Sequence, residues 1–261
     1  MELETLRQRI AVLAGQALLL LALLACWQAA AILFPAPHLP RLERIASSFW
    51  NLVHGEALVR EVLPSAARVG VGLALGIVLG TGIGLAIGYF RALDPWLRPI
   101  LEFLRALPAV TILPAALLLL GATDAMRVSI IVFGCMPPVL LAAIDGARRV
   151  DDLLLDTARV SRLSAWHTVA RVIVPAALPQ IFAGIRIALG VALIMMVISE
   201  LLASQNGLGA FIQRNQRLFN TANVYAGVLV IGVLAWLFTA AMLKLEKRVL
   251  RWHRGWRGAT E

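Results

Sequence analysis

The chain has 261 residues, of which 60% are apolar and 15% are charged, and its mean hydropathy is +0.83. Soluble domains are about 45–50% apolar and about 25% charged. This composition excludes a disordered chain, a nucleic-acid-binding domain and an ordinary soluble enzyme. It predicts one all-α integral membrane domain over residues 1–261. The net charge of +9 is informative mainly through its distribution along the chain.

Six stretches approach the roughly 20 apolar residues that a transmembrane helix needs. The first is too long for a signal-peptide core of about 7–15 residues, so we expect an uncleaved anchor. The third is short and contains Pro108 and Pro114, whose backbone needs neighbouring helices, so it should not face lipid all round. The predicted spans are residues 10–34, 67–90, 107–121, 125–144, 181–203 and 222–243.

The distribution of Lys and Arg predicts the orientation. With six spans both termini lie on one side, and that side also holds the connections 91–105 and 145–180. Sixteen of the 24 basic residues fall there, seven fall on the other side, and Arg186 lies within a span. Because basic loops stay in the cytoplasm, both termini are expected to be cytoplasmic. The basic tail, residues 244–261, is expected to lie on anionic lipid.

Glycines recur every four residues along the second predicted span. Small residues at this spacing let helix backbones approach closely in lipid. The stripe predicts helix packing, either as a static contact or as an interface that slides. Its members are Gly72, Gly76, Gly80, Gly84 and Gly88.

Residue patterns for catalysis are missing. The four histidines have no metal-motif neighbours, and Cys26 and Cys135 sit in apolar runs, where we expect packing. A P-loop needs a lysine after glycine, and Lys244 and Lys247 do not follow one. The sequence predicts no catalytic, cofactor-binding or metal-binding residue. Any energy from ATP must come from another subunit.

The connection of residues 145–180 predicts a short amphipathic helix. Asp151 and Asp152 suit a helix start, and Leu154, Leu155, Ala158 and Leu163 recur at helical spacing. Pro175 and Pro179 mark the return toward the membrane. Such a helix either lies on lipid or docks into a groove of a soluble partner.

This connection resembles the EAA loop of bacterial ABC importer permeases. Asp156-Thr157-Ala158 stands where that motif has Glu-Ala-Ala, and Val174-Pro175 stands where it has a hydrophobic-Pro pair. The largest departure is Arg162, in place of the glycine that ordinarily breaks the coupling helix.

Further segments are similar, in the same order, to the nitrate/sulfonate/taurine branch of these permeases, over roughly residues 40–252. They are Pro64 to Gly88, Leu93-Asp94-Pro95, Arg105 to Pro108, Gly184 to Leu189, Ser199-Glu200 followed by Gly207-Leu208-Gly209, and Leu245 to Arg248.

The resemblance implies a six-helix type I importer permease with a cytoplasmic coupling helix between spans four and five. It implies a bacterial inner membrane location and, as partners, a second permease copy, two cytoplasmic ATPases that carry ATP and Mg, and a periplasmic binding protein. The solute would be a small anion such as a sulfonate, taurine or nitrate, or alternatively a heterocycle such as a thiamine-precursor pyrimidine. A secondary transporter would instead need coupling-ion carboxylates within the spans, and a membrane enzyme would need clustered His, Asp or Lys.

The resemblance also implies residue roles. Contacts to the ATPase are expected from the coupling segment, with Leu163 as an apolar anchor: Asp156, Thr157, Ala158, Arg159, Arg162, Leu163 and Ser164. A pathway or gate role is expected for Arg186, Ser199, Glu200, Gly207 and Gly209, with structural roles as the alternative for Arg186 and Glu200. The polar segment 204–223 is either a solvated loop or a contact for the binding protein.

Overall fold

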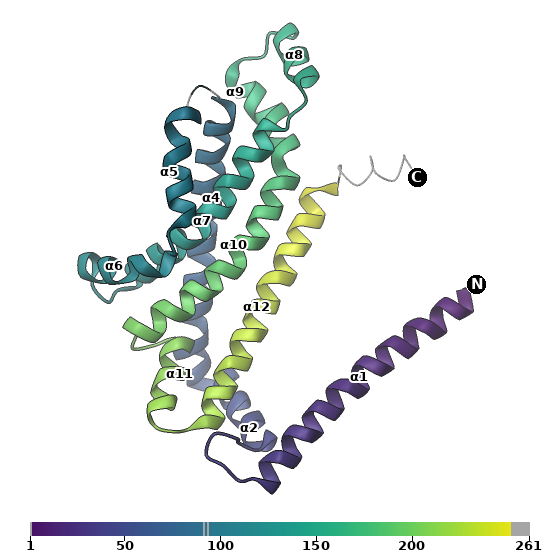
Figure 1. Cartoon of the computed structure of the whole chain (residues 1–261), viewed down its shortest axis with the longest axis vertical. Helices are drawn as coiled ribbons and strands as arrows, with labels where there is room; N and C mark the ends of the chain where they lie inside the picture. The colour runs from purple at the N-terminus through teal and green to yellow at the C-terminus, as the bar shows by residue number, and fades with distance from the viewer. Residues whose placement is uncertain (1, 91, 93, 252–261) are drawn as a thin grey trace.

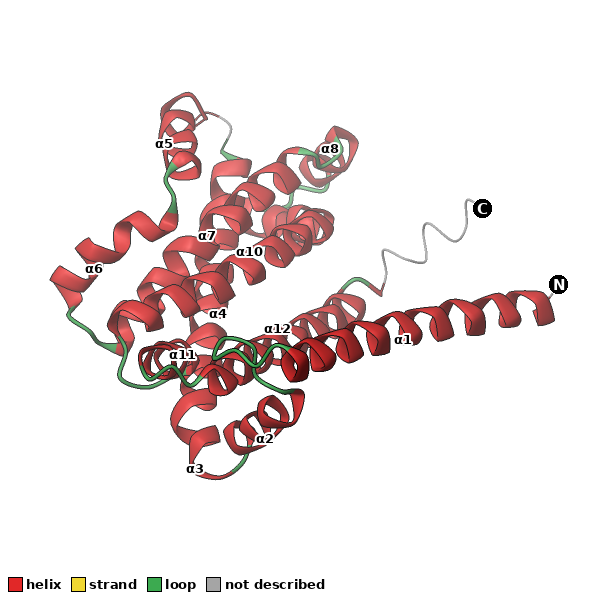
Figure 2. Cartoon of the chain, turned by 60° about the horizontal axis from the view of Figure 1, so that its bottom comes forward, coloured by secondary structure: helices red, strands yellow, loops and turns green. Residues whose placement is uncertain are grey.

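The computed structural model describes residues 2–90, 92 and 94–251, and this part of the chain consists of helices and loops without a strand (Figures 1 and 2). The long helices are α1 (Glu2–Leu33), α4 (Leu63–Tyr89), α7 (Asp124–Arg148), α10 (Val174–Ala203) and α12 (Thr221–Val249). Shorter ones are α2 (Leu42–Val53), α3 (Gly55–Ala57), α5 (Asp94–Ala106), α6 (Leu113–Leu120), α8 (Asp152–Val160), α9 (Ala165–Thr168) and α11 (Leu208–Arg217).

Five helical segments among the described residues are long and apolar enough to cross a membrane, or six if one bent pair counts as a span. The five are Ala14–Leu33, Gly55–Tyr89, Asp124–Arg148, Ala165–Ala203 and Thr221–Val249. They contain the predicted spans 10–34, 67–90, 125–144, 181–203 and 222–243 apart from a few terminal residues.

The predicted third span, 107–121, coincides with the second member of a bent helix pair, and the pair counts as a sixth span when its two members are taken together. The pair Pro95–Leu104 and Ala109–Leu120 is bent by 85°. Pro108 explains the break, because it offers no N–H and disfavours helical backbone in the residue before it. Beyond it come a 3-10 turn, η3 (Ala109–Ile112), and α6, whose eight residues reach only about 12 Å.

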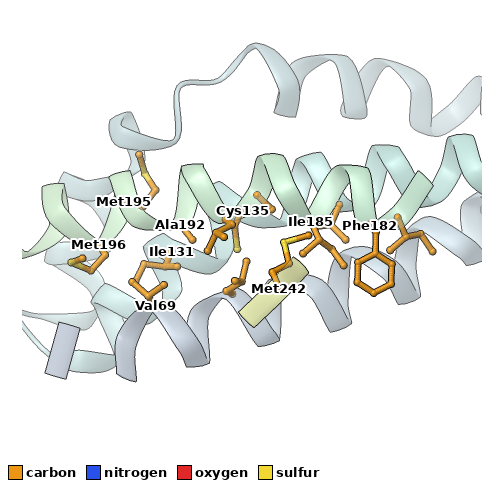
Figure 3. Packing of buried hydrophobic residues seen from close by; sticks show 14 of the residues in the cluster. Val69, Ile131, Cys135, Phe182, Ile185, Ala192, Met195, Met196 and Met242 are labelled. Atoms are coloured by element: carbon orange, nitrogen blue, oxygen red, sulfur yellow. The ribbon is translucent and has the colours of Figure 1, made fainter. Parts of the chain in front are cut away.

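Helices α4, α7 and α10 form the core, with α12 beside α2 and α11. Val69, Ile131 and Met196 lie in this core near the start of α4 and the end of α10 (Figure 3). Helices α5 and α6 lie to one side (Figure 2). Helix α1 leaves the bundle next to α2 and runs away from it, so its apolar side chains are exposed, as expected for a helix in lipid (Figure 1).

The glycine stripe of α4 faces α7 at backbone distance. A Cβ built on Gly72 would lie 2.5 Å from a methyl carbon of Ile131, and one on Gly84 would lie 2.5 Å from the carbonyl oxygen of Leu140. Gly76, Gly80 and Gly88 meet α7 in the same way. The five glycines therefore set the separation of the two helices.

Two spans begin in the same manner, with a π-helical turn followed by proline. The turn η1 (Leu58–Val62) precedes Pro64 in α4, and η4 (Val169–Ile173) precedes Pro175 in α10. A proline cannot donate to the carbonyl four residues earlier, so the preceding turn widens. Through η4, the chain passes from α8 and α9, which form the coupling segment, directly into α10.

Candidate functional site

Two ends of the bundle carry distinct groups of polar residues. Figure 1 shows α8 and α9 at one end, called the α8 end below, and α2 and α11 at the opposite end, the α11 end. Helix α10 runs between them. The residues predicted to touch an ATPase lie at the α8 end, and the predicted gate residues Glu200, Gly207 and Gly209 lie at the α11 end.

The coupling segment is built from α8, a tight turn and α9. Asp151 caps α8 by accepting from the N–H of Leu153 at 3.0 Å, and Ser164 caps α9 by accepting from the N–H of His167 at 3.4 Å. Both caps satisfy N–H groups that a helix start leaves free. The segment is thereby held in a defined shape although few of its residues touch the core.

Arg162 occupies the left-handed position of the turn after α8, with φ of 51°. The N–H of Leu163 bonds to the carbonyl of Ala158 at 3.1 Å and that of Arg162 to Arg159 at 3.0 Å, which is the Schellman pattern. Glycine is the residue usually found at this position. The turn therefore forms here in spite of the arginine.

Replacing Arg162 with glycine is expected to raise the free energy of unfolding by up to about 1 kcal/mol, since glycine adopts this backbone without steric cost. The matched control is Arg159→Gly within α8, which should lower it by about 1 kcal/mol. Thermal unfolding of the purified protein measures both. Destabilisation by Arg162→Gly would contradict the strain assigned to this turn.

The predicted ATPase-contact residues do not share one surface. Asp156, Thr157, Arg159, Arg162 and Ser164 are exposed. Ala158, however, is only 3% exposed and packs within its own chain. Leu163 is half-buried and lines a cavity of about 320 Å³ between the coupling segment and the ends of α4 and α7, so its side chain is directed toward the bundle.

The coupling segment also exposes several apolar residues that are not among the predicted ATPase contacts. Val160 is 85% exposed, and Leu153, Leu154 and Trp166 are also exposed. The helical spacing grouped Leu154 with Leu155, whereas only Leu155 turns toward the core. An apolar surface on an α8 that has weak contact with the bundle needs a partner or lipid to cover it.

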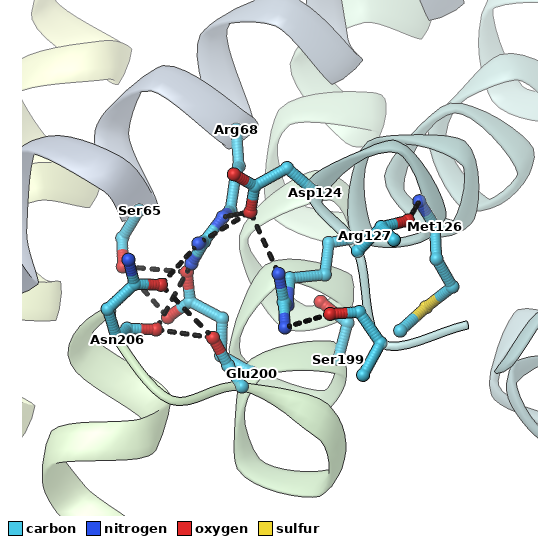
Figure 4. Close-up of polar contacts among 12 residues, drawn as sticks. Ser65, Arg68, Asp124, Met126, Arg127, Ser199, Glu200 and Asn206 are labelled. Carbon is cyan, nitrogen blue, oxygen red and sulfur yellow. Dashed lines mark hydrogen bonds and ion pairs between the residues drawn. The ribbon is translucent and has the colours of Figure 1, made fainter. Parts of the chain in front are cut away.

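At the α11 end, Glu200 lies at the centre of a buried group of charges (Figure 4). Its side chain is 0% exposed and accepts from Arg68 Nη1 at 2.5 Å, from the Ser65 hydroxyl at 2.8 Å and from the N–H of Gly209 at 3.0 Å. Buried charges require this kind of pairing. We call the following set, whose outer members Asp124 and Arg214 are exposed, the buried charge cluster: Glu61, Ser65, Arg68, Asp124, Arg127, Glu200, Asn206 and Arg214.

Arg68 connects four parts of the chain. Besides Glu200 on α10, it donates from Nε to Asp124 at the start of α7 at 2.9 Å and from Nη2 to the side chain of Asn206 at 2.6 Å. Arg127 donates to Asp124 at 2.8 Å and to the backbone carbonyls of Ala122 and Ala203. Three carboxylates and three guanidinium groups thus balance within the cluster.

Gly207 and Gly209 provide the space for Glu200. Gly207 has φ of +104°, and a Cβ there would lie 2.6 Å from the carboxylate of Glu200. A Cβ on Gly209 would lie 2.6 Å from Cβ of Glu200. The structure therefore brings these three predicted gate residues into direct contact.

Ser199 and Arg186 are placed differently from Glu200. Ser199 is buried and donates to the carbonyl of Met196 within α10 at 2.9 Å. Arg186 lies about 21 Å along α10 from Glu200, given a rise of 1.5 Å per residue. It pairs with Glu246 of α12 at 2.8 Å on a largely exposed face. The predicted gate set therefore divides into two locations.

Sequence reasoning missed Glu61, Ser65, Arg68, Asp124, Arg127 and Asn206 as members of the site. In the sequence, Arg68 and Arg127 contribute only to the count of positive charges on one side. A weak signal existed, because a charge at the edge of an apolar run is costly without a partner. The partner Glu200 lies 132 residues away from Arg68, and no spacing rule connects them.

A cavity of about 530 Å³ lies between α5, α7 and α10. Its walls are mostly apolar, and Asp145 and Gln180 are among the lining residues. Pro137 and Pro138 also line it, and these prolines leave the carbonyls of Phe133 and Gly134 without their usual helical donors. Acceptor groups within a membrane helix are tolerated where they face water or protein.

Comparison with known proteins identifies the family. Residues 72–251 match the family described as "Binding-protein-dependent transport system inner membrane component". The chain is 32% identical over 221 residues to the aliphatic sulfonates transport permease protein SsuC of Bacillus subtilis, covering 84% of this chain and 80% of that protein. It is 29% identical over 196 residues to the taurine transport system permease protein TauC of Escherichia coli, covering 75% and 71%.

The fold is similar to that of a solved transporter. An inward-facing structure of the MetNI methionine ABC transporter has a chain that aligns with a TM-score of 0.63 at 18% identity, covering 74% of this chain and 95% of that one. This similarity supports the type I importer fold predicted from the sequence. The family match and the identity to SsuC show that the chain belongs to the binding-protein-dependent transport family and is a multi-pass inner-membrane permease subunit of an ABC importer.

Proposed function

We propose that two copies of this chain form the transport pathway, that two cytoplasmic ATPases bind at the α8 ends, and that a periplasmic binding protein delivers the solute at the α11 ends. The family match over residues 72–251 carries this proposal. The exposed apolar residues of the coupling segment support it, because a helix with such a surface can dock into a groove of a partner.

The orientation follows from charge. The α8 end holds the connection of residues 145–180 and the C-terminal basic residues of α12. Basic connections favour the cytoplasmic side, and we therefore infer that the α8 end and both termini face the cytoplasm. ATP is then bound and hydrolysed, with Mg, on the partner subunits. This chain changes conformation in response and forms the transport pathway.

Movement passes from the ATPase to the pathway through α10. The coupling segment enters α10 through the widened turn η4, and α10 extends to Glu200 at the opposite end. The cavity between α5, α7 and α10 supplies space for a solute on one face of α10. A displacement of the coupling segment can therefore reach both the cavity and the buried charge cluster.

The solute proposed first is a small anion that contains a sulfonate group. The relatives SsuC and TauC are named for aliphatic sulfonates and for taurine. Uptake into proteoliposomes that contain the permease, its ATPase and its binding protein, with labelled taurine and an alkanesulfonate as probes, tests this part. Uptake of neither would reject the solute class and leave the importer assignment standing.

Val160→Asp is expected to weaken binding of the ATPase by about tenfold or more, because a charge replaces an exposed apolar contact at an interface. The measurement is co-purification of the ATPase in mild detergent, followed by titration of the purified subunits. Leu218→Asp is the matched control, since Leu218 is 76% exposed but lies next to α11, at the opposite end. Equal binding by wild type and Val160→Asp would place the ATPase contact elsewhere.

A further inference from the structure

The loop of residues 204–207 and helix α11 form a unit that we call the α11 cap. The cap follows α10 directly, yet most of its polar contacts reach other elements. The N–H of Gly207 donates to Glu61 of η1 at 3.0 Å, and the N–H of Leu208 donates to Ser65 of α4 at 2.8 Å. The N–H of Gly209 donates to Glu200 of α10 at 3.0 Å.

These three contacts satisfy the first N–H groups of α11 with side chains from three different elements. Helix starts usually obtain such partners from their own cap residue or from water. Two of the acceptors are buried carboxylates, which also suit the positive end of the helix dipole. The start of α11 is thereby attached to η1, α4 and α10 at once.

Arg68 and Arg214 extend this attachment over the rest of the cap. Arg68 donates to both the backbone and the side-chain oxygen of Asn206, at 3.2 and 2.6 Å. Arg214 donates to Glu61 at 2.6 Å and to the carbonyl of Gln205 at 2.6 Å. The Arg68 contact is buried, whereas Arg214 is partly exposed. Water therefore competes for the outer contact much more than for the inner one.

The face of the cap away from the cluster has a different character. Leu218 and Phe219 are strongly exposed at the turn into α12, and Phe219 has φ of 53°. Asn223 of α12 donates to Asn215 of α11 at 2.7 Å. The cap therefore also contacts α12 of its own bundle, and the turn that follows the cap is exposed at Leu218 and Phe219.

We propose that Arg68 is a positioning residue that fixes the α11 cap to α4 and α10, so that the cap turns with these helices as one body during transport. This proposal rests on the proposed function. Opening at the α11 end then takes place between the caps of the two copies, and Glu200 acts in the attachment of each cap, with no opening between Glu200 and Gly207.

The proposal is tested by distances between spin labels in the complex with the ATPase, without nucleotide and after trapping with ATP and vanadate. The exposed native thiol is removed by Cys26→Ser, and Cys135 is buried. Labels at Gln216→Cys and Arg60→Cys report the distance from cap to η1 within a chain, when labelled chains are diluted with unlabelled ones. A single label at Gln216→Cys in both copies reports the distance between caps.

The expected result is an unchanged distance within the chain and a changed distance between the caps. A changed distance within the chain would overturn the proposal, and so would a distance between the caps that stays constant. Asn206→Ala removes the side-chain contact of Arg68 without leaving a charge unpaired, and it should broaden the distribution within the chain. Arg217→Gln is the control, because Arg217 is exposed on α11 outside the cluster, and it should leave that distribution narrow.

An unbroadened distribution in Asn206→Ala would show that Arg68 does not provide the restraint, and would overturn its assigned role. The proposed function fails separately, and is recognised by a complex that binds no ATPase or hydrolyses no ATP. In a complex that hydrolyses ATP and can be trapped, the distances alone decide the proposal.

Discussion

Replacing Arg68 with methionine is expected to lower the free energy of unfolding by about 3–5 kcal/mol, because it leaves a buried carboxylate without its partner. Glu200 is 0% exposed, so water cannot replace the guanidinium. Thermal unfolding in detergent measures the loss. The double variant Arg68→Met, Glu200→Gln should recover most of it, since a neutral amide can still accept from Gly209.

The control is Arg159→Met, which removes an arginine that pairs with Asp156 within α8. Both partners are exposed outside the spans, so this pair is expected to contribute less than about 1 kcal/mol. Equal destabilisation by Arg68→Met and Arg159→Met would contradict the argument from burial. Failure of the double variant to recover would show that the guanidinium acts through contacts other than Glu200.

Gly84→Val is the second substitution with a large expected effect. A side chain at Gly84 would meet the carbonyl oxygen of Leu140 and the methyl group of Ala143, so that α4 and α7 would have to separate. Overpacking of this kind costs about 1–3 kcal/mol and sometimes more. We expect a reduced yield of folded protein and a lower unfolding temperature.

Gly82 is the control on the same helix. A Cβ there meets nothing within 4 Å, and Gly82 borders an apolar groove of about 700 Å³ between α4, α10 and α12. Gly82→Val should therefore leave stability unchanged or raise it slightly, because valine favours the helix more than glycine does. A similar loss of stability in Gly84→Val and Gly82→Val would contradict the role of the glycine stripe in setting the distance between α4 and α7.

The sequence predicted the long spans well because each is a continuous apolar run, and such runs need no knowledge of the neighbours. It did not predict that residues 107–121 continue a preceding helix, Pro95–Leu104, through a sharp bend next to Pro108. The mean hydropathy of a window does not show whether the helix axis bends within it or next to it. The backbone chemistry of one proline determined the outcome.

The buried charge cluster could be predicted only in part. The resemblance to the permease family points to Glu200, Gly207 and Gly209, and the structure shows them in contact. Ser65 and Arg68 join them from a distant helix, at a position where the chain offers no local pattern. Similarly, helical spacing found the coupling helix, but it could not determine which side of α8 the bundle would cover, as Ala158 and Leu154 show.

At Arg162 the backbone and the side chain have separate consequences. Its backbone has the left-handed conformation and the hydrogen bonds of a helix stop, while its side chain is exposed on the surface proposed to meet the ATPase. The arginine thus adds a positive charge to that surface without altering the turn. Charges outside a buried contact mainly change the rate at which partners meet and make that rate depend on salt. The rate of assembly of this transporter should therefore depend more on ionic strength than that of its Arg162→Gly variant, with little difference between the two once salt screens the charge.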